Sequence, residues 1–263
     1  MKLTILITGA SGGIGKEFAL VAAEKKNDVV LVARSESLLK NLCEQITTKY
    51  QVKANYLICD LSEYGSAEKL YKEVIKRGFK INYLINNAGF GDYGNFVERS
   101  LSKYQQMIHL NITSLTELTW LFAKDMVRET HGGILNIAST ASVQPDPYMA
   151  IYGATKSFVA NFTEALSYEL KDTGVTATVL SPGATTTGFF SEAEMGGSKM
   201  MGSKMMTAEK VARIGYDAMM KGKLHVIAGF VNKMLGFFSA VMPSSRFKLR
   251  VAAAILGKKP NSD

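Results

Sequence analysis

The chain has 263 residues, of which 47% are hydrophobic and 21% charged, so a largely disordered protein is excluded and one large domain is expected. No apolar run approaches the roughly 20 residues of a membrane-spanning helix, and the first residues do not read as a signal peptide. Cys43 and Cys59 form no paired motif, which fits a reducing cytoplasm and argues against a metal site. We therefore expect a cytoplasmic protein without a bound metal.

The net charge of +8 comes from the last fifth of the chain. Residues 1–209 contain 21 basic and 21 acidic residues, whereas residues 210–263 contain ten Lys and Arg against two acids, Asp217 and Asp263. Such an asymmetry indicates an acidic partner, a membrane surface or simply a solvated basic tail.

Strand-like apolar runs alternate with helix-length segments along the chain. The runs cover residues 3–8, 28–33, 54–59, 82–86, 134–139, 175–181 and 224–228, and the segments cover 14–26, 36–49, 63–77, 101–130, 153–172 and 207–221. Nearly continuous apolar strands separated by helices are typical of a parallel sheet covered on both faces. We therefore predict an α/β fold: a single doubly wound Rossmann-type domain over residues 1–228, with a seven-stranded, mainly parallel sheet, and a C-terminal helical extension over 229–263.

The turn after the first strand reads TGASGGIG and leads from a strand into a helix. There Gly9 would permit a tight turn, Gly13 would let the backbone approach a pyrophosphate, and Gly15 would let the helix pack close to the strand. The start of the helix adds backbone N–H groups and a favourable dipole for phosphates. We expect a dinucleotide to bind here, in contact with Gly9, Ser11, Gly13, Ile14 and Gly15.

The second strand ends in Ala33, Arg34 and Ser35, without the acid that commonly binds the ribose hydroxyls of NAD(H). A guanidinium can instead pair with the 2′-phosphate of NADP(H), and Ser35 can add a hydrogen bond. The pattern favours NADP(H) as cofactor, with NAD(H) as the alternative. Arg34 would then be an exposed residue that only pairs with Glu36.

Tyr152 and Lys156 are four residues apart in YGATK, which places both on one face of a helix. The pKa of a free phenol is near 10, and an adjacent ammonium is expected to lower it, giving a tuned acid–base pair. The other interpretation is a core tyrosine beside a surface lysine. Ser139, NNAG (86–89) and SPGATTT (181–187) each follow a strand, at the edge where open α/β sheets bind ligands.

In this order the motifs resemble those of the short-chain dehydrogenase/reductase family over residues 3–189. The matching residues are Thr8, Gly9, Gly13, Gly15, Asp60, Leu61, Asn86 to Gly89, Asn111, Ser139, Tyr152, Lys156, Pro182, Gly183 and Thr187. The resemblance implies an oxidoreductase in which Tyr152 exchanges a proton with the substrate oxygen and Ser139 orients that oxygen. It also implies that Lys156 tunes Tyr152 and binds the nicotinamide ribose, and that Asn111 holds a water linking Lys156 to solvent.

The same resemblance implies further contacts with the cofactor. Those to the adenine and its ribose come from Asp60, Leu61, Asn87, Ala88 and Gly89. Those around the nicotinamide come from Pro182, Gly183, Thr185 and Thr187. Gly12 departs from the pattern, since many NADP-preferring members carry a basic residue there, so selectivity for the phosphate would rest on Arg34.

The segment after the sixth strand contains the tandem repeat GSKMMGSKMM at residues 197–206. Glycines can act as hinges, and methionines adapt to irregular apolar shapes. We predict a substrate lid over about residues 188–206, and the alternative is a surface loop. The apolar lining of the lid would come from Met195, Met200, Met201, Met205 and Met206.

The predicted function is an NADPH-dependent carbonyl reductase or alcohol dehydrogenase for a hydrophobic ketone or secondary alcohol. The alternatives are a reductase of carrier-bound 3-oxoacyl chains and a non-enzymatic NADP-sensing regulator, and nucleic-acid binding is not expected. Residues 229–263 either pack against the sheet or another subunit, or form an apolar and basic surface for a membrane or an acidic carrier protein. The resemblance implies a homo-oligomer, and the extension allows a membrane-associated location beside a cytoplasmic one.

Overall fold

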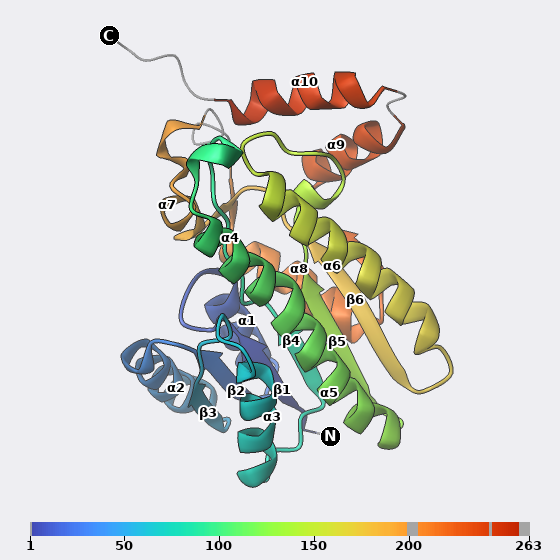
Figure 1. Ribbon diagram of the computed structural model, residues 1–263. Helices are drawn as coiled ribbons and strands as arrows, with labels where there is room; N and C mark the ends of the chain where they lie inside the picture. Colours follow the sequence, from blue (N-terminus) through green and yellow to red (C-terminus); the bar gives the residue numbers. More distant parts are fainter. Residues whose placement is uncertain (1, 199–204, 242–243, 258–263) are drawn as a thin grey trace.

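A seven-stranded parallel sheet forms the centre of the computed structural model, which describes residues 2–198, 205–241 and 244–257 (Figure 1). The strands run in the order β3-β2-β1-β4-β5-β6-β9, and each neighbouring pair is parallel. Their bounds are β1 (Thr4–Thr8), β2 (Asp28–Ala33), β3 (Ala54–Ile58), β4 (Tyr83–Asn86), β5 (Gly132–Ile137), β6 (Val175–Ser181) and β9 (His225–Ile227). The predicted fold class is thus confirmed.

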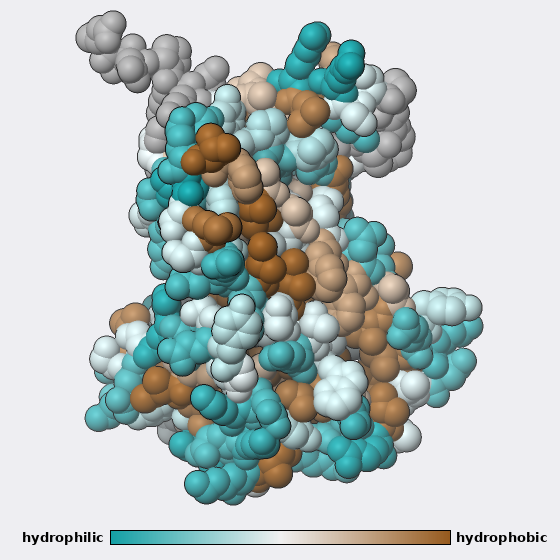
Figure 2. Space-filling view, viewed as in Figure 1, coloured by the Kyte–Doolittle hydropathy of each residue, from teal (hydrophilic) through white to brown (hydrophobic). Residues whose placement is uncertain are grey.

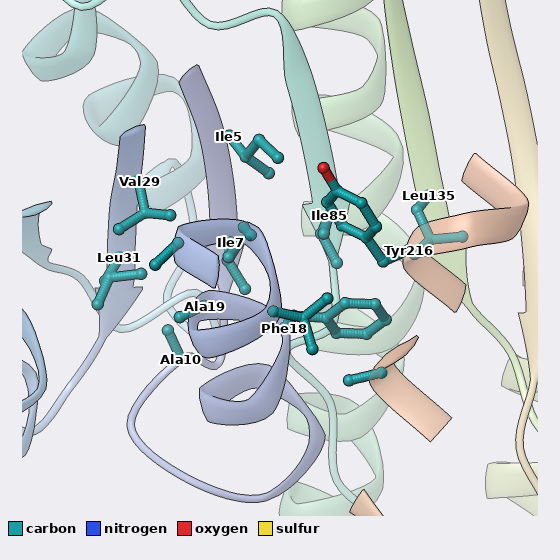
Figure 3. Packing of buried hydrophobic residues seen from close by; sticks show 14 of the residues in the cluster. Ile5, Ile7, Ala10, Phe18, Ala19, Val29, Leu31, Ile85, Leu135 and Tyr216 are labelled. Carbon is teal, nitrogen blue, oxygen red and sulfur yellow. The ribbon is translucent and has the colours of Figure 1, made fainter. Parts of the chain in front are cut away.

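The strands form where the apolar runs predict them because helices bury both faces of the sheet. Alternate residues of β1 point to opposite faces: Ile5 and Ile7 belong to one hydrophobic cluster and Leu6 to another. Figure 3 shows the first cluster, in which Phe18 from the neighbouring helix lies beneath Ile7. Buried side chains on both faces hold the sheet as a rigid platform for its carboxyl edge.

Helices cover the sheet from two sides (Figure 1). The first cluster includes side chains from α1 (Gly13–Glu24), α2 (Glu36–Tyr50) and α8 (Ala208–Met220). The opposite clusters include side chains from α3 (Ser66–Lys76), α5 (Leu115–Arg128) and α6 (Ala150–Glu169). The hydroxyl of Thr207 accepts a hydrogen bond from the Lys210 N–H and so caps the start of α8.

The helix predicted over 101–130 is divided into three parts. α4 (Leu101–Ile108) passes into a π-helical turn, η2 (His109–Ser114), before α5 begins. Asn111 lies in this turn, and its side chain bonds the backbone of Phe90 and the hydroxyl of Thr155. These tertiary bonds favour the wider turn, a feature that is frequent at functional sites.

Strand order reverses beside β1. The chain builds β1, β2 and β3 in one direction and then returns to place β4 on the other side of β1. The loops that follow β1 and β4 therefore diverge in opposite directions, and the crevice between them is the usual ligand site of such sheets.

Several short elements that the apolar pattern does not predict lie near the carboxyl edge of the sheet. β7 (Thr185–Thr186) pairs with β8 (Met206–Thr207) in a small parallel sheet. The single-turn helices are η1 (Phe96–Glu98), η3 (Thr140–Ser142), α7 (Phe189–Glu192) and η4 (Met195–Gly197). Beyond β9, α9 (Phe230–Val241) and α10 (Ser245–Leu256) lie over this edge (Figure 1). None of the helices in the described ranges is long and apolar enough to cross a membrane.

Substitution of Gly15 tests how closely α1 packs under the turn that follows β1. A Cβ atom on Gly15 would lie 2.2 Å from the carbonyl oxygen of Gly9, whereas one on Gly12 would meet nothing within 4 Å. We expect Gly15→Ala to cost about 3 kcal/mol or more through overpacking, which lowers the thermal midpoint by roughly 6–12 °C. Gly12→Ala is the matched control, expected within about 0.5 kcal/mol of wild type. Equal midpoints for the two variants would contradict this account of the turn.

Candidate active site

The turn after β1 is held by hydrogen bonds from the loop after β4. The hydroxyl of Thr8 accepts from the N–H groups of Asn87 and Ala88, both at 3.0 Å. The amide of Asn87 donates to the carbonyls of Thr8 at 3.0 Å and Gly9 at 3.3 Å. Gly9 adopts a φ of +65°, which side chains disfavour, and a Cβ atom there would lie 2.8 Å from the Asn87 amide nitrogen. Two of the predicted motifs thus form one rigid cradle.

A largely exposed cation, Arg34, follows the end of β2. The Arg34 side chain is 73% exposed and lies 3.9 Å from a carboxylate oxygen of Asp60, a weak contact in water. It does not pair with Glu36, which accepts a hydrogen bond from Tyr56 instead. Burial raises the pKa of Asp60, but hydrogen bonds from Ser62 and the charge of Arg34 outweigh it, so the pKa lies below its usual value.

Tyr152 and Lys156 lie one turn apart on α6, and both side chains are buried. The Lys156 ammonium nitrogen lies 5.8 Å from the centre of the Tyr152 ring and donates to the carbonyl oxygen of Ile137 at 2.8 Å. The alternative of a surface lysine beside a core tyrosine is therefore wrong. α6 places two ionisable groups together at the carboxyl end of β5.

Burial, rather than the neighbouring ammonium, dominates the ionisation of this pair. It raises the pKa of Tyr152 to about 12, against a smaller lowering by a hydrogen bond to Ser139 and with a further rise from the charge of Asp146. It lowers the pKa of Lys156 to about 8. The net shift is opposite to the lowering expected from Lys156, because burial of the phenol outweighs the other influences on the pKa of Tyr152. At neutral pH Tyr152 holds its proton and Lys156 is mostly charged.

Asn111 lies one layer behind the cavity. It is 1% exposed, and its carbonyl accepts from the Phe90 N–H at 3.2 Å. A Cβ atom on Gly89 would lie 2.9 Å from the Asn111 carbonyl oxygen and 3.4 Å from the Lys156 ammonium nitrogen. Because residue 89 is glycine, the Asn111 carbonyl oxygen and the Lys156 ammonium nitrogen can both lie close to the backbone there. Asn111 is held in place by its hydrogen bonds to the backbone of Phe90.

The loop between β5 and α6 adds Ser139 and a carboxyl group. The Ser139 hydroxyl accepts from the Ala141 N–H at 3.1 Å and is also hydrogen-bonded to Tyr152. Asp146 is 7% exposed and accepts a 3.2 Å hydrogen bond from the Gln144 amide. Burial raises the pKa of Asp146 from 3.8 to about 6, with the Gln144 bond acting weakly against it. Gln144 and Asp146 both line the cavity, although no sequence motif points to them.

A single cavity of about 1720 Å³ brings the predicted residues together. Two of the predicted residues do not line it: Gly15 packs beneath the turn, and Asn111 stands behind Gly89. Those that do are Gly9, Ser11, Gly13, Ile14, Arg34, Ser35, Asp60, Leu61, Asn87, Ala88, Gly89, Ser139, Tyr152, Lys156, Pro182, Gly183, Thr185 and Thr187.

The other half of the cavity is apolar and was largely missed by sequence reasoning. The Phe189 ring lies 5.2 Å from the Tyr152 ring, and Met149 and Phe190 belong to the same hydrophobic cluster. Of the predicted lid methionines, Met195, Met205 and Met206 line the cavity, while Met200 and Met201 lie outside the described residues. The sequence signal for this wall was the pair of phenylalanines directly after the SPGATTTG stretch.

An ion-pair network ties the segment after β7 to α4. The carboxylate of Asp92, fully buried, is 2.6 Å from the Lys103 ammonium and bonds the Arg99 guanidinium at 2.8 Å. Glu194 contacts the same two cations at 2.9 Å each. Burial raises the pKa of Asp92, but these bonds and charges bring it below its usual value. The network anchors the residues around Glu194 beside the cavity.

Asp146 and Asp92 give opposite predictions for stability. Because the folded-state pKa of Asp146 is raised, the stability that this group contributes is present below about pH 4 and lost as pH rises through 6. Asp146→Asn should therefore stabilise the protein near pH 8, by at most about 3 kcal/mol, and the gain should disappear towards pH 4. Asp92→Asn is the control: it should destabilise near pH 8, since the pKa of Asp92 is lowered. Thermal midpoints across this pH range check both, and a pH-independent effect of Asp146→Asn would contradict the assignment.

Comparison with known proteins agrees with this geometry. The family model "short chain dehydrogenase" matches residues 3–196. Very-long-chain 3-oxoacyl-CoA reductase of Anas platyrhynchos is 32% identical over 183 residues, which are 67% of this chain and 58% of that protein. The 17-beta-hydroxysteroid dehydrogenase type 3 of Mus musculus is 33% identical over 181 residues, again 67% and 58% of the two chains. The chain thus matches less than two thirds of the length of these relatives.

A solved structure extends the likeness to nearly the whole chain. A short-chain dehydrogenase from Sphingobium yanoikuyae in complex with NADPH is similar with a TM-score of 0.81 and 29% identity, covering 92% of this chain and 97% of that one. The family match, the parallel sheet and the clustered motif residues agree with one another. The chain belongs to the short-chain dehydrogenases, a family of NAD(P)-dependent oxidoreductases that act on CH–OH and C=O groups.

Proposed function

We propose that the protein is an NADPH-dependent carbonyl reductase for bulky hydrophobic ketones, which also oxidises the corresponding secondary alcohols. One observation carries the proposal. A protonated, buried Tyr152 stands next to Lys156 where the polar half of the cavity meets its aromatic and methionine-rich half. A carbonyl oxygen placed there would meet a proton donor, while the carbon skeleton would lie against apolar side chains.

The polar half of the cavity fits a dinucleotide. The glycine cradle is closed to side chains at Gly9 and Gly15 and open at Gly12, and it precedes the start of α1. Arg34 is exposed, and no acidic residue stands at the end of β2. A 2′-phosphate could pair with this guanidinium, which favours NADP(H) over NAD(H). The relative from Sphingobium yanoikuyae is in complex with NADPH. When bound, the nicotinamide supplies the hydride that reduces the carbonyl carbon.

The protein's own contribution is a proton and its position. In reduction, the Tyr152 hydroxyl transfers its proton to the carbonyl oxygen as the C=O bond becomes C–OH. The Ser139 hydroxyl, already hydrogen-bonded to Tyr152, donates to the same oxygen and holds it in line. Lys156 places a positive charge beside the resulting phenolate, and Asn111 fixes the loop at Gly89 close to that charge.

The apolar half supports a bulky substrate. Tyr152, Phe190, Met149, Met195 and Leu256 belong to one buried cluster, so a small polar ketone would leave much of this wall unfilled. We extend the proposal to the segment around residues 188–206 as the substrate lid, whose described part contributes Met195 and Met205 to the cluster. The named relatives act on steroids and on long acyl chains, both bulky and apolar.

A second candidate is the reduction of 3-oxoacyl thioesters. It is favoured by the 32% identity to very-long-chain 3-oxoacyl-CoA reductase and needs the same proton donor. A panel of bulky ketones, hydroxysteroids and 3-oxoacyl thioesters, followed by loss of NADPH absorbance, separates the two by their ratios of kcat/KM.

We also propose that the protein forms homo-oligomers through the outer face of α4, α5 and α6. Leu101, Trp120 and Phe158 on these helices are 68%, 59% and 40% exposed. Large apolar side chains in this number are commonly covered by a second subunit.

Replacing Tyr152 with Phe tests the proposed chemistry. The variant removes the proton donor and keeps the ring, so we expect kcat to fall about 10²–10⁴-fold, with NADPH binding retained in a fluorescence titration. Tyr148→Phe is the matched control, because this tyrosine lies next to Tyr93 and does not line the cavity. An unchanged rate for Tyr152→Phe would refute the mechanism. A wild-type protein that binds NADPH but reduces no member of the panel would refute the enzymatic proposal.

Arg34 tests the cofactor preference. Arg34→Ala removes one charged contact to the 2′-phosphate, so KM for NADPH should rise roughly 10- to 100-fold, while KM for NADH should stay the same. Lys40→Ala on α2 is the control, since Lys40 does not line the cavity. A wild-type preference for NADH, or parallel changes for both cofactors, would contradict the proposal.

A further inference from the structure

The C-terminal helices close one side of the cavity. The carbonyl oxygen of Leu256 accepts hydrogen bonds from the Tyr93 hydroxyl at 2.6 Å and the Ser198 hydroxyl at 3.1 Å. Leu256 and Ala252 are buried, which fixes the inner side of α10. At α9, the Asn232 side chain lies within 2.4–2.6 Å of where a Cβ atom of Gly183 would be. α9 and α10 are therefore docked on the walls of the cavity.

The mouth of the cavity is rimmed by apolar side chains that also face outward. Phe230, Val231 and Ile255 line the cavity, yet they are 75%, 69% and 44% exposed. On the same two helices, Met234, Phe247 and Leu249 are also exposed, at 42%, 54% and 41%. We call these six side chains the α9–α10 surface. An apolar surface around a cavity mouth indicates a partner that covers it.

The charge on the same two helices is entirely basic. Residues 229–257 contain no Asp or Glu, and Lys233, Arg246, Lys248 and Arg250 lie among the apolar residues. Figure 2 shows hydrophilic side chains projecting from the outer edge of α10, with hydrophobic ones beside them. A second copy docked face to face would bring these like charges together, which disfavours a symmetric dimer through this surface. Apolar side chains among cations match the headgroup region of an anionic bilayer.

The dimensions fit a helix pair that lies on the membrane. Each helix has 12 residues, about 18 Å of length, against the roughly 30 Å of a hydrocarbon core. We propose that the α9–α10 surface docks on anionic phospholipid bilayers, with the mouth of the cavity against the lipid. An apolar substrate could then enter from the bilayer without crossing water. The docking itself does not depend on which reaction the cavity performs.

Vesicle co-sedimentation tests the docking. The full chain is mixed with vesicles of phosphatidylcholine alone or of equimolar phosphatidylcholine and phosphatidylglycerol. We expect binding to the mixed vesicles, at least about tenfold weaker binding to phosphatidylcholine, and loss of binding as salt is raised. No binding of the wild-type chain to the mixed vesicles would overturn the proposal.

Two surface variants locate the contact. Phe247→Ser with Leu249→Ser, and separately Arg246→Glu with Lys248→Glu, should each weaken binding to the mixed vesicles about tenfold or more. The matched controls are Ile75→Ser, an apolar residue on α3 that is 52% exposed, and Lys221→Glu with Lys223→Glu after α8. These controls should bind as wild type does. Equal binding by the surface variants and the controls would place the lipid contact elsewhere and overturn the proposal.

Two further measurements separate docking from folding and from other partners. Phe247 and Leu249 do not line the cavity, so their double variant should keep the thermal midpoint and the wild-type rate on a water-soluble ketone. A retained rate together with lost vesicle binding supports the proposal. If the Phe247 and Leu249 variant unfolds and loses both, the variant with Arg246→Glu and Lys248→Glu provides the test of vesicle binding. A change of molar mass in light scattering for the Phe247 and Leu249 variant, or binding to an acidic acyl carrier protein in preference to vesicles, would assign the surface to a protein and overturn it.

Discussion

The contact between the ends of β1 and β4 is the constraint on which the rest of the site depends. Asn87 donates its backbone N–H to the Thr8 hydroxyl and its side-chain amide to the Thr8 carbonyl, across the point where strand order reverses. Gly15 lies directly below, so the turn is fixed from both sides. Every other functional group is placed relative to this edge, because parallel strands deliver the later loops to the same end of the sheet.

Desolvation is the second constraint, and it sets the protonation states. Tyr152, Lys156 and Asp146 all lie in the interior, where water stabilises none of their charges well. Burial lowers the pKa of Lys156 and raises that of Tyr152, so Tyr152 stays neutral, while the Lys156 ammonium donates to the Ile137 carbonyl. Asp146 is a carboxyl group with a raised pKa close to Tyr152. A site that favours neutral forms in this way suits an apolar carbonyl compound better than a charged one.

The sequence predicts the seven strands and the polar half of the cavity well, because both depend on local patterns. Apolar runs predict buried strands, and glycine, amide and hydroxyl motifs predict loops at their ends. The break at η2 could not be predicted, since it arises from bonds between Asn111 and two distant segments. The pKa values of Tyr152 and Lys156 were also out of reach, because burial is a property of the folded chain. Asp146 carries no motif, and only its packing reveals it.

The contact between Asn232 and Gly183 couples two parts of the chain that sequence patterns treat as separate. Gly183 belongs to the loop after β6 that flanks the polar half of the cavity, and Asn232 belongs to the first turn of α9. A side chain at 183 would have to displace the Asn232 side chain, whose amide donates to the carbonyl of Ala228 just before α9. The loop after β6 and the first turn of α9 are therefore packed as one unit at the entrance of the cavity. Residues 183 and 232 therefore constrain each other: a larger residue at 183 needs a smaller one at 232 if α9 is to keep its place beside the cavity.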